Sequence, residues 1–237
     1  MIEAHDRVRQ RANKRRSARP SFAARLIVVG GQCRKVGKTA LVVDLIKAFP
    51  EYRWTAIKIT PHVEFGCPVK GVRCSCGPRE HTFAIRYERA RKRKTDTSRF
   101  LAAGAETAIW VETKTGRLKA ALSALAWAIG DVENVIVESN AILSYWQADL
   151  FLLVVDPEKA DFKSSARKVQ RLADAFVFRS PCVRGAHPKG ALIPKYGRPK
   201  FFQPLGVALP ANMQRFVRQR FLQMGHPKAR QPVRIFS

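Results

Sequence analysis

The sequence predicts an α/β fold with three layers, in which helices cover both faces of a mainly parallel central sheet. Short apolar segments typical of buried strands alternate with segments whose apolar residues recur at helical spacing. The segments between successive strands are long enough for the crossovers that parallel strands require. A glycine-bounded loop also follows the first strand and leads directly into the first helix. The 237 residues suit one such domain with basic extensions at both ends.

The expected elements follow from these patterns. Strands are predicted where apolar and β-branched residues form short runs, at 22–29, 53–59, 107–111, 134–138, 149–155, 175–178 and 206–209. Helices are predicted where the apolar spacing is helical or a start signal precedes it, at 40–47, 96–105, 116–129, 140–146, 164–173 and 211–224. Residues 60–95 show no clear period, and we expect a long loop there.

The loop after the first strand carries the strongest chemical signal. It reads Gly31-Gln32-Cys33-Arg34-Lys35-Val36-Gly37-Lys38-Thr39-Ala40, and Gly-Lys-Thr between a strand and a helix is typical of a phosphate-binding loop. Backbone N–H groups and the helix N-terminus would bind a polyphosphate. Lys38 would reach the terminal phosphates, and the Thr39 hydroxyl would ligate Mg²⁺. The alternative is a glycine-rich turn that binds nothing. We therefore expect a P-loop NTPase domain at 22–180.

The loop departs from the usual spacing. Five residues separate Gly31 from Gly37, where four are usual, so Gln32 takes the first glycine position. This spacing resembles the loop of dethiobiotin synthetases.

A second Mg²⁺ ligand should be a carboxylate at the end of a neighbouring strand. Glu138 ends the strand at 134–138 and is the first candidate, and Asp156 is the second. Asp96 opens a helix after the long loop, where it could face the γ-phosphate or serve only as an N-cap. Asp44, on the first helix, is expected to be structural. The predicted catalytic residues are Lys38, Glu138 and Asp96.

The order of motifs resembles the B-type proteins of molybdopterin-guanine dinucleotide biosynthesis. The resemblance covers about residues 25–180 and includes the loop, Ile57-Lys58, Asp96-x2-Arg99-x3-Ala103-Gly104-Ala105, and Val135-Ile136-Val137-Glu138. It implies a small nucleotide-binding protein of the SIMIBI class, related to dethiobiotin synthetase and nickel-insertion GTPases. Ser139-Asn140 replaces the glycine that commonly follows the glutamate, and the guanine-reading Asn/Thr-Lys-x-Asp motif is absent. GTP and ATP therefore both remain open.

The region at 60–95 is rich in cysteine. His62, Cys67, Cys74, Cys76 and His81 lie within twenty residues of one another. Three thiolates with one imidazole could hold Zn²⁺, and three thiolates could hold part of an iron–sulfur centre. The alternative is unligated cysteines in a flexible loop. Cys33 is expected to contribute only its backbone.

Charge distinguishes this chain from an ordinary globular protein. Lys and Arg number 44 against 18 Asp and Glu, which gives a formal net charge of +26. Clusters of basic residues lie in an arm at 1–21, at 86–94 and in a tail at 181–237. Nucleic-acid binding through the arm and tail is one interpretation, and a solvated basic surface, which no known nucleic-acid-binding motif accompanies, is the favoured one. No apolar run is long enough to span a membrane. Five unevenly spaced cysteines suggest reduced thiols and a cytoplasmic protein.

These features favour Mg²⁺-dependent binding and hydrolysis of GTP or ATP. The resemblance implies an accessory factor in cofactor or metal-centre biosynthesis, acting on a client enzyme or cofactor intermediate. One alternative is an ATP-dependent small-molecule kinase or ligase of the dethiobiotin-synthetase type, and another is a nucleic-acid-binding protein. A homodimer is an arrangement open to proteins of this class.

Overall fold

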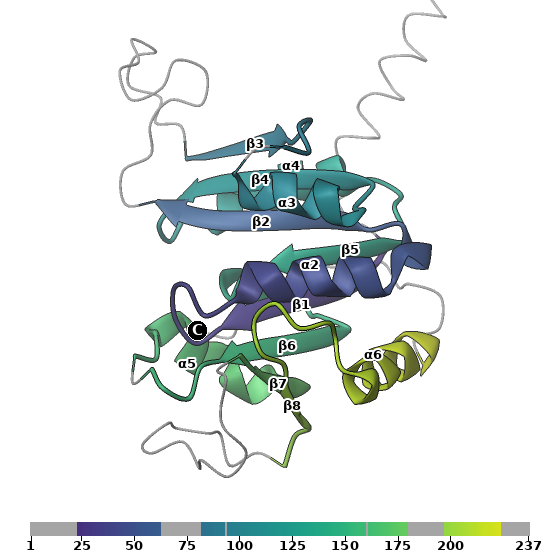
Figure 1. Ribbon diagram of the computed structural model, residues 1–237. Coiled ribbons are helices and arrows are strands. Elements are labelled where there is room, and N and C mark those ends of the chain that lie inside the picture. Colours follow the sequence, from purple (N-terminus) through teal and green to yellow (C-terminus); the bar gives the residue numbers. More distant parts are fainter. Residues whose placement is uncertain (1–22, 63–81, 93, 160, 180–196, 224–237) are drawn as a thin grey trace, which may run out of the picture.

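The computed structural model describes residues 23–62, 82–92, 94–159, 161–179 and 197–223. Its centre is an eight-stranded sheet in the order β3-β4-β2-β5-β1-β6-β7-β8 (Figure 1). Every neighbouring pair is parallel except β3 and β4. The strands are β1 Arg25–Gly31, β2 Thr55–His62, β3 Phe83–Tyr87, β4 Thr107–Lys114, β5 Asn134–Glu138, β6 Leu150–Val155, β7 Ala175–Phe178 and β8 Lys200–Phe202. The predicted mainly parallel sheet is confirmed.

Helices lie on both faces of this sheet, so the fold has the three predicted layers (Figure 1). They are α2 Lys38–Ala48, α3 Asp96–Ala103, α4 Leu118–Ile129, α5 Ser164–Val169 and α6 Ala211–Gln223, with short 3-10 turns η1 Pro50–Tyr52, η2 Ala141–Ser144 and η3 Gln170–Leu172. One hydrophobic core joins α2, α3 and α6 to the sheet. The other joins α4 and α5 to the opposite face. Because both faces are covered, strands such as β5 and β6 are buried along their whole length.

The main error of the sequence analysis lies in the expected loop at 60–95. Strand β2 continues to His62, and Phe83–Tyr87 forms the edge strand β3, antiparallel to β4. Only one residue of β3, Ala84, is buried, so the strand lacks the apolar run of a central strand. A half-exposed edge strand of this kind gives a weak sequence signal.

The second error lies near the C-terminus. The predicted strand at 206–209 is absent, because the chain turns after Pro204 and Gly206 has a φ of 80°. The strand lies earlier, at β8, and pairs with β7. Met213 and Val217 of α6 belong to the core beside α2. The region expected as a basic extension therefore supplies both a strand and a helix to the domain.

Some expectations concern residues outside the described ranges. These include the basic arm at 1–21 and most of the cysteine-rich segment. Within the described ranges, no helix is both long and apolar enough to cross a membrane.

A glycine in β1 gives a test of this packing. A Cβ on Gly30 would lie 2.4 Å from Asn140 Oδ1 and 2.7 Å from the Phe151 ring. We expect Gly30→Ala to lower the free energy of unfolding by about 1–3 kcal/mol through overpacking, as measured by urea denaturation. Gly197→Ala, whose Cβ would meet no atom within 4 Å, is the control. Equal stability of the two variants would contradict the packing described here.

Candidate functional site

The loop between β1 and α2 has the backbone shape of an anion-binding turn. Lys35 has a φ of 55° and Gly37 a φ of 94°, so both adopt left-handed conformations that reverse the chain before the helix. Gly37 is the N-cap of α2, and no side chain of the described residues caps this helix. The first turn of α2 also contains no acidic residue. The N–H groups and the positive end of the helix dipole therefore remain available for an anion.

Two amide side chains hold this loop in place. Asn140 binds Gly31 twice, because its Oδ1 accepts from the Gly31 N–H and its Nδ2 donates to the Gly31 carbonyl, each at 2.9 Å. Gln32, only 2% exposed, donates to the carbonyls of Lys159 and Asp161 and accepts from the Asp156 N–H. The Gln32 side chain thus joins the loop to the segment after β6. The Gln32 backbone is also paired, because its N–H donates to the Val154 carbonyl and its carbonyl accepts from the Lys163 N–H, so Gln32 anchors the loop.

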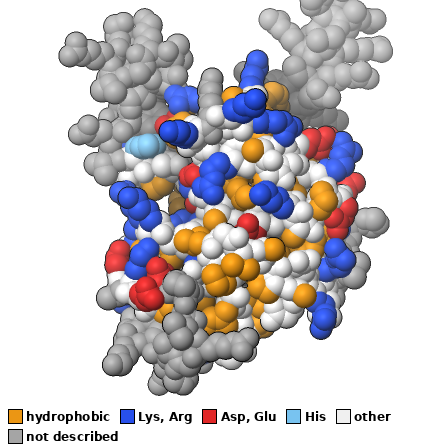
Figure 2. Space-filling model, in the orientation of Figure 1, with side chains coloured by type: hydrophobic (Ala, Val, Ile, Leu, Met, Phe, Trp, Pro, Cys, Tyr) orange, Lys and Arg blue, Asp and Glu red, His pale blue; other side chains and the backbone are white. Residues whose placement is uncertain are grey.

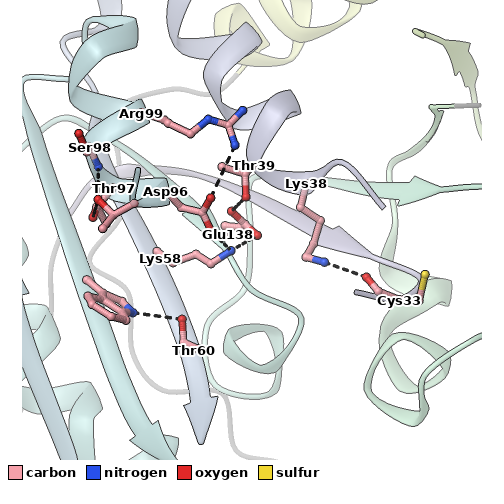
Figure 3. A network of polar contacts seen from close by, with 12 residues as sticks. Cys33, Lys38, Thr39, Lys58, Thr60, Asp96, Thr97, Ser98, Arg99 and Glu138 are labelled. Atoms are coloured by element: carbon pink, nitrogen blue, oxygen red, sulfur yellow. Dashed lines mark hydrogen bonds and ion pairs between the residues drawn. The ribbon is translucent and has the colours of Figure 1, made fainter. Parts of the chain in front are cut away.

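The lysine of the loop binds the loop's own backbone. Lys38 Nζ donates to the Cys33 carbonyl at 2.9 Å (Figure 3). Burial lowers the pKa of Lys38, and the nearby Glu138 carboxylate partly opposes that shift. A bound polyanion would favour the charged form of this ammonium.

Glu138 is the acidic centre of the site. It is 2% exposed at the carboxyl end of β5, where Thr39 Oγ1 donates to its Oε2 at 2.8 Å. Lys58 Nζ contacts the other oxygen of Glu138 and lies 3.1 Å from Asp96 Oδ2 (Figure 3). The parallel register places Lys58 of β2 directly beside Glu138 of β5. Two predicted carboxylates, Glu138 and Asp96, therefore meet through one lysine.

A separate network fixes the start of α3. Thr95 is the N-cap, and its hydroxyl accepts from the Ser98 N–H at 3.1 Å. The Glu88 carboxylate accepts from the hydroxyls of Thr95 and Thr97 and from two backbone N–H groups. The N-cap role considered for Asp96 belongs instead to Thr95. Asp96 is the first helical residue and directs its carboxylate toward Lys58.

The other two carboxylates are structural in this arrangement. Asp156 accepts from the Glu158 N–H at 3.1 Å and lies 3.3 Å from Lys159, so it closes the turn after β6. Asp44 accepts from both terminal nitrogens of Arg179 at 3.2 Å and from Gln203 at 2.8 Å. The structural role expected for Asp44 agrees with these contacts.

Of the predicted cysteine-rich site, the structure describes only His62. Its Nε2 lies 3.3 Å from Glu112. Cys67, Cys74, Cys76 and His81 fall outside the described residues, where the Zn²⁺ or iron–sulfur site stays a prediction. The described residues contain no cluster of three metal-ligating side chains. Cys33 is buried, donates to the Arg34 carbonyl, and has its pKa raised by burial, which favours an unreactive thiol.

Two residues of the site were not predicted as functional. The first is Lys58, which the sequence analysis noted without a role. The sequence did contain a signal for Lys58. A lysine within the apolar run of β2 needs a partner of opposite charge, and another strand ends in a glutamate. The second is Asn140, noted only as a departure from glycine. Its position two residues after Glu138 gave no indication of contact with Gly31.

Comparisons with known proteins add little detail. No family model and no curated protein matches the chain. Among solved structures, it is similar to LpxK from Aquifex aeolicus in complex with ATP, with a TM-score of 0.43 and 16% identity over 83% of this chain and 59% of that one. It is also similar to a zinc-bound mutant of the YjiA GTPase, with a TM-score of 0.42 and 14% identity over 81% and 61% of the two chains. The chain spans less than two thirds of the length of either structure.

Because Asn140 makes two hydrogen bonds to Gly31, replacing it with the similarly shaped aspartate should lower stability. Asn140→Asp replaces the donor to the Gly31 carbonyl with an oxygen, so two acceptors would face each other. We expect a loss of about 1–3 kcal/mol in unfolding free energy, measured by urea denaturation. Asn212→Asp, at an exposed position in the first turn of α6, is the control and should not lower stability, because a carboxylate still accepts from the Met213 N–H and suits a helix start. Equal losses of unfolding free energy in Asn140→Asp and Asn212→Asp would argue against the role of Asn140 as an anchor of the loop.

The pKa of Glu88 predicts a pH-dependent contribution to stability. Burial alone would raise this pKa, but the hydrogen bonds from backbone and threonine donors lower it overall. The stabilisation should be present above the unfolded pKa, about 4.3, and be lost as the pH falls through the lower folded value. Melting temperatures of wild type and Glu88→Gln should differ slightly at pH 7 and converge once the pH has fallen below the folded pKa. A difference independent of pH would contradict this role. The effect should stay below about 1 kcal/mol, because solvent screens this carboxylate.

Proposed function

We propose that this protein binds a nucleoside triphosphate with Mg²⁺ at the loop 31–40 and hydrolyses it. The observation that supports the proposal best is the meeting of two features at one point. The uncapped start of α2, with Lys38, adjoins the contact between Thr39 and Glu138. An anion-binding helix start beside paired oxygen ligands is the combination that a metal–polyphosphate requires.

The oxygen ligands fit Mg²⁺. This ion prefers hydroxyl, carboxylate and water oxygens, and Thr39 and Glu138 provide a hydroxyl and a carboxylate in direct contact. The Lys58 ammonium already lies against the same carboxylate, so the site accommodates positive charge. Thr39 and Glu138 would hold the ion, which would neutralise charge on the β- and γ-phosphates when bound.

The other roles in binding and hydrolysis would fall to residues of the protein itself. Lys38 would leave the Cys33 carbonyl and donate to the terminal phosphates, where its charge stabilises the transition state. The loop amides would bind the phosphate oxygens. Asp96, at the start of α3, would respond to the γ-phosphate and so link nucleotide state to α3. The structure supports this link through the contact between Asp96 and Lys58.

The finer assignment is an accessory factor in cofactor or metal-centre biosynthesis. It follows from the resemblance of the motifs to the molybdopterin-guanine dinucleotide B-type proteins, and the client stays to be identified. A small-molecule kinase or ligase would instead require an acceptor for turnover. A nucleic-acid-binding protein would show affinity that falls steeply with salt.

Nucleotide binding should depend on Lys38. We expect the native protein to bind GTPγS or ATPγS with Mg²⁺ at about micromolar Kd, and Lys38→Ala to weaken binding by about tenfold or more. Calorimetry at moderate salt measures this, and phosphate release from GTP and ATP measures turnover. Lys47→Ala, an exposed lysine at the other end of α2, controls for the change in net charge. Binding that is equally strong in Lys38→Ala would refute the proposed site.

A further inference from the structure

Lys58 occupies an unusual position for a lysine in a central strand. Its side chain is 18% exposed and lies between the carboxylates of Glu138 and Asp96, which are 2% and 39% exposed. The three groups come from β2, β5 and α3 (Figure 3). The ammonium therefore stands where two acidic side chains converge beside Thr39.

The negative charges at this point are compensated without any added ion. Glu138 and Asp96 contribute two negative charges, and the neighbouring positive groups are Lys58, Lys38 and Arg99, which lies 3.7 Å from Asp96. Burial has the largest effect on the pKa of Lys38 and lowers it, and Lys38 is close enough to Glu138 and Lys58 that Glu138 raises this pKa and Lys58 lowers it. A divalent cation approaching Glu138 without a nucleotide would meet two ammonium groups, and their repulsion is weakly screened because Glu138 and Lys58 are only 2% and 18% exposed.

We propose that Lys58 is a built-in competitor for the metal position and makes metal binding depend on the nucleotide. This inference rests on the proposed function. With the site empty, the Lys58 ammonium neutralises Glu138 and Asp96 and keeps free divalent cations out. A triphosphate brings enough negative charge to hold both ammonium groups and the metal. The metal then enters together with the nucleotide and displaces Lys58 from Glu138.

The same displacement would act on α3. Lys58 contacts Asp96 as well as Glu138, so an ammonium that leaves one carboxylate changes its contact with the other. Lys58 is in this sense a positioning residue, which relates the filling of the metal site to the first turn of α3.

The test measures binding of Mn²⁺, a spectroscopic substitute for Mg²⁺, to the full-length protein without nucleotide. Lys58→Met keeps an unbranched side chain but removes the charge. We expect electron paramagnetic resonance to show Mn²⁺ affinity at least about tenfold higher in Lys58→Met than in wild type. Lys58→Arg, which keeps the charge, should bind as weakly as wild type. Lys47→Met gives the same change in net charge at an exposed position and should also resemble wild type.

Loss of stability gives a second measurement. Lys58→Met leaves Glu138 buried without its cation, which is destabilising. Added Mn²⁺ should then raise the melting temperature of Lys58→Met more than that of wild type. Unchanged Mn²⁺ affinity in Lys58→Met would overturn the inference, as would an equal shift in melting temperature or an equal gain of affinity in Lys47→Met.

Failure of this inference and failure of the proposed function can be distinguished. Binding of Mg²⁺ with GTPγS or ATPγS to wild type is measured in parallel. Nucleotide binding without a gain of Mn²⁺ affinity in Lys58→Met would overturn only the role of Lys58. A gain of Mn²⁺ affinity in a protein that binds no nucleotide would overturn the proposed function and leave the competition at Glu138 standing.

Discussion

The site depends on the burial of one carboxylate. Glu138 lies at the end of a fully buried strand, and a charge in that position is costly unless hydrogen bonds and an opposite charge compensate it. Thr39 supplies the hydrogen bond and Lys58 the charge. The strand order β2-β5-β1 allows both residues to reach Glu138, because it places β5 between the strand that carries Lys58 and the strand that leads to Thr39. Sheet topology and local electrostatics thus specify the same point.

Hydrogen bonds through amide side chains explain how the loop tolerates its unusual sequence. The loop has one more residue than the usual spacing, and two amide side chains anchor its start: Asn140 binds Gly31, and the side chain of the next residue, Gln32, binds the segment after β6. The close approach of Asn140 also requires Gly30, whose hydrogen leaves space for the amide oxygen. Gln32, in the first glycine position, and Asn140, one residue after the position where glycine is common, therefore contribute to one structure.

The sequence predicted most of what local pattern and strand order determine. Apolar runs located β5 and β6, and the rule that ligands gather at the carboxyl ends of parallel strands selected Glu138. Prediction from the sequence failed where the deciding contact joins residues that are distant in the chain. Lys58 acquires its role only from the pairing of β2 with β5, and β3 is a strand because β4 offers it an edge. Thr95 caps α3 in place of Asp96 with the help of Glu88, a residue in the region expected to be a loop.

Residues near the C-terminus also make contacts, distant in sequence, that shape the loop. Arg179, 2% exposed, and Gln203 both bind Asp44 on α2, which joins the ends of β7 and β8 to the helix that begins at the loop. A Cβ on Gly37 would lie 3.1 Å from Leu205 and 3.3 Å from Arg179, so these side chains pack against the turn of the loop. A buried arginine requires its carboxylate partner, which fixes the distance between β7 and α2. The shape of the loop is therefore set from both sides, by Asn140 on one side and, on the other, by Arg179 together with Leu205 of the segment that the sequence suggested was an extension.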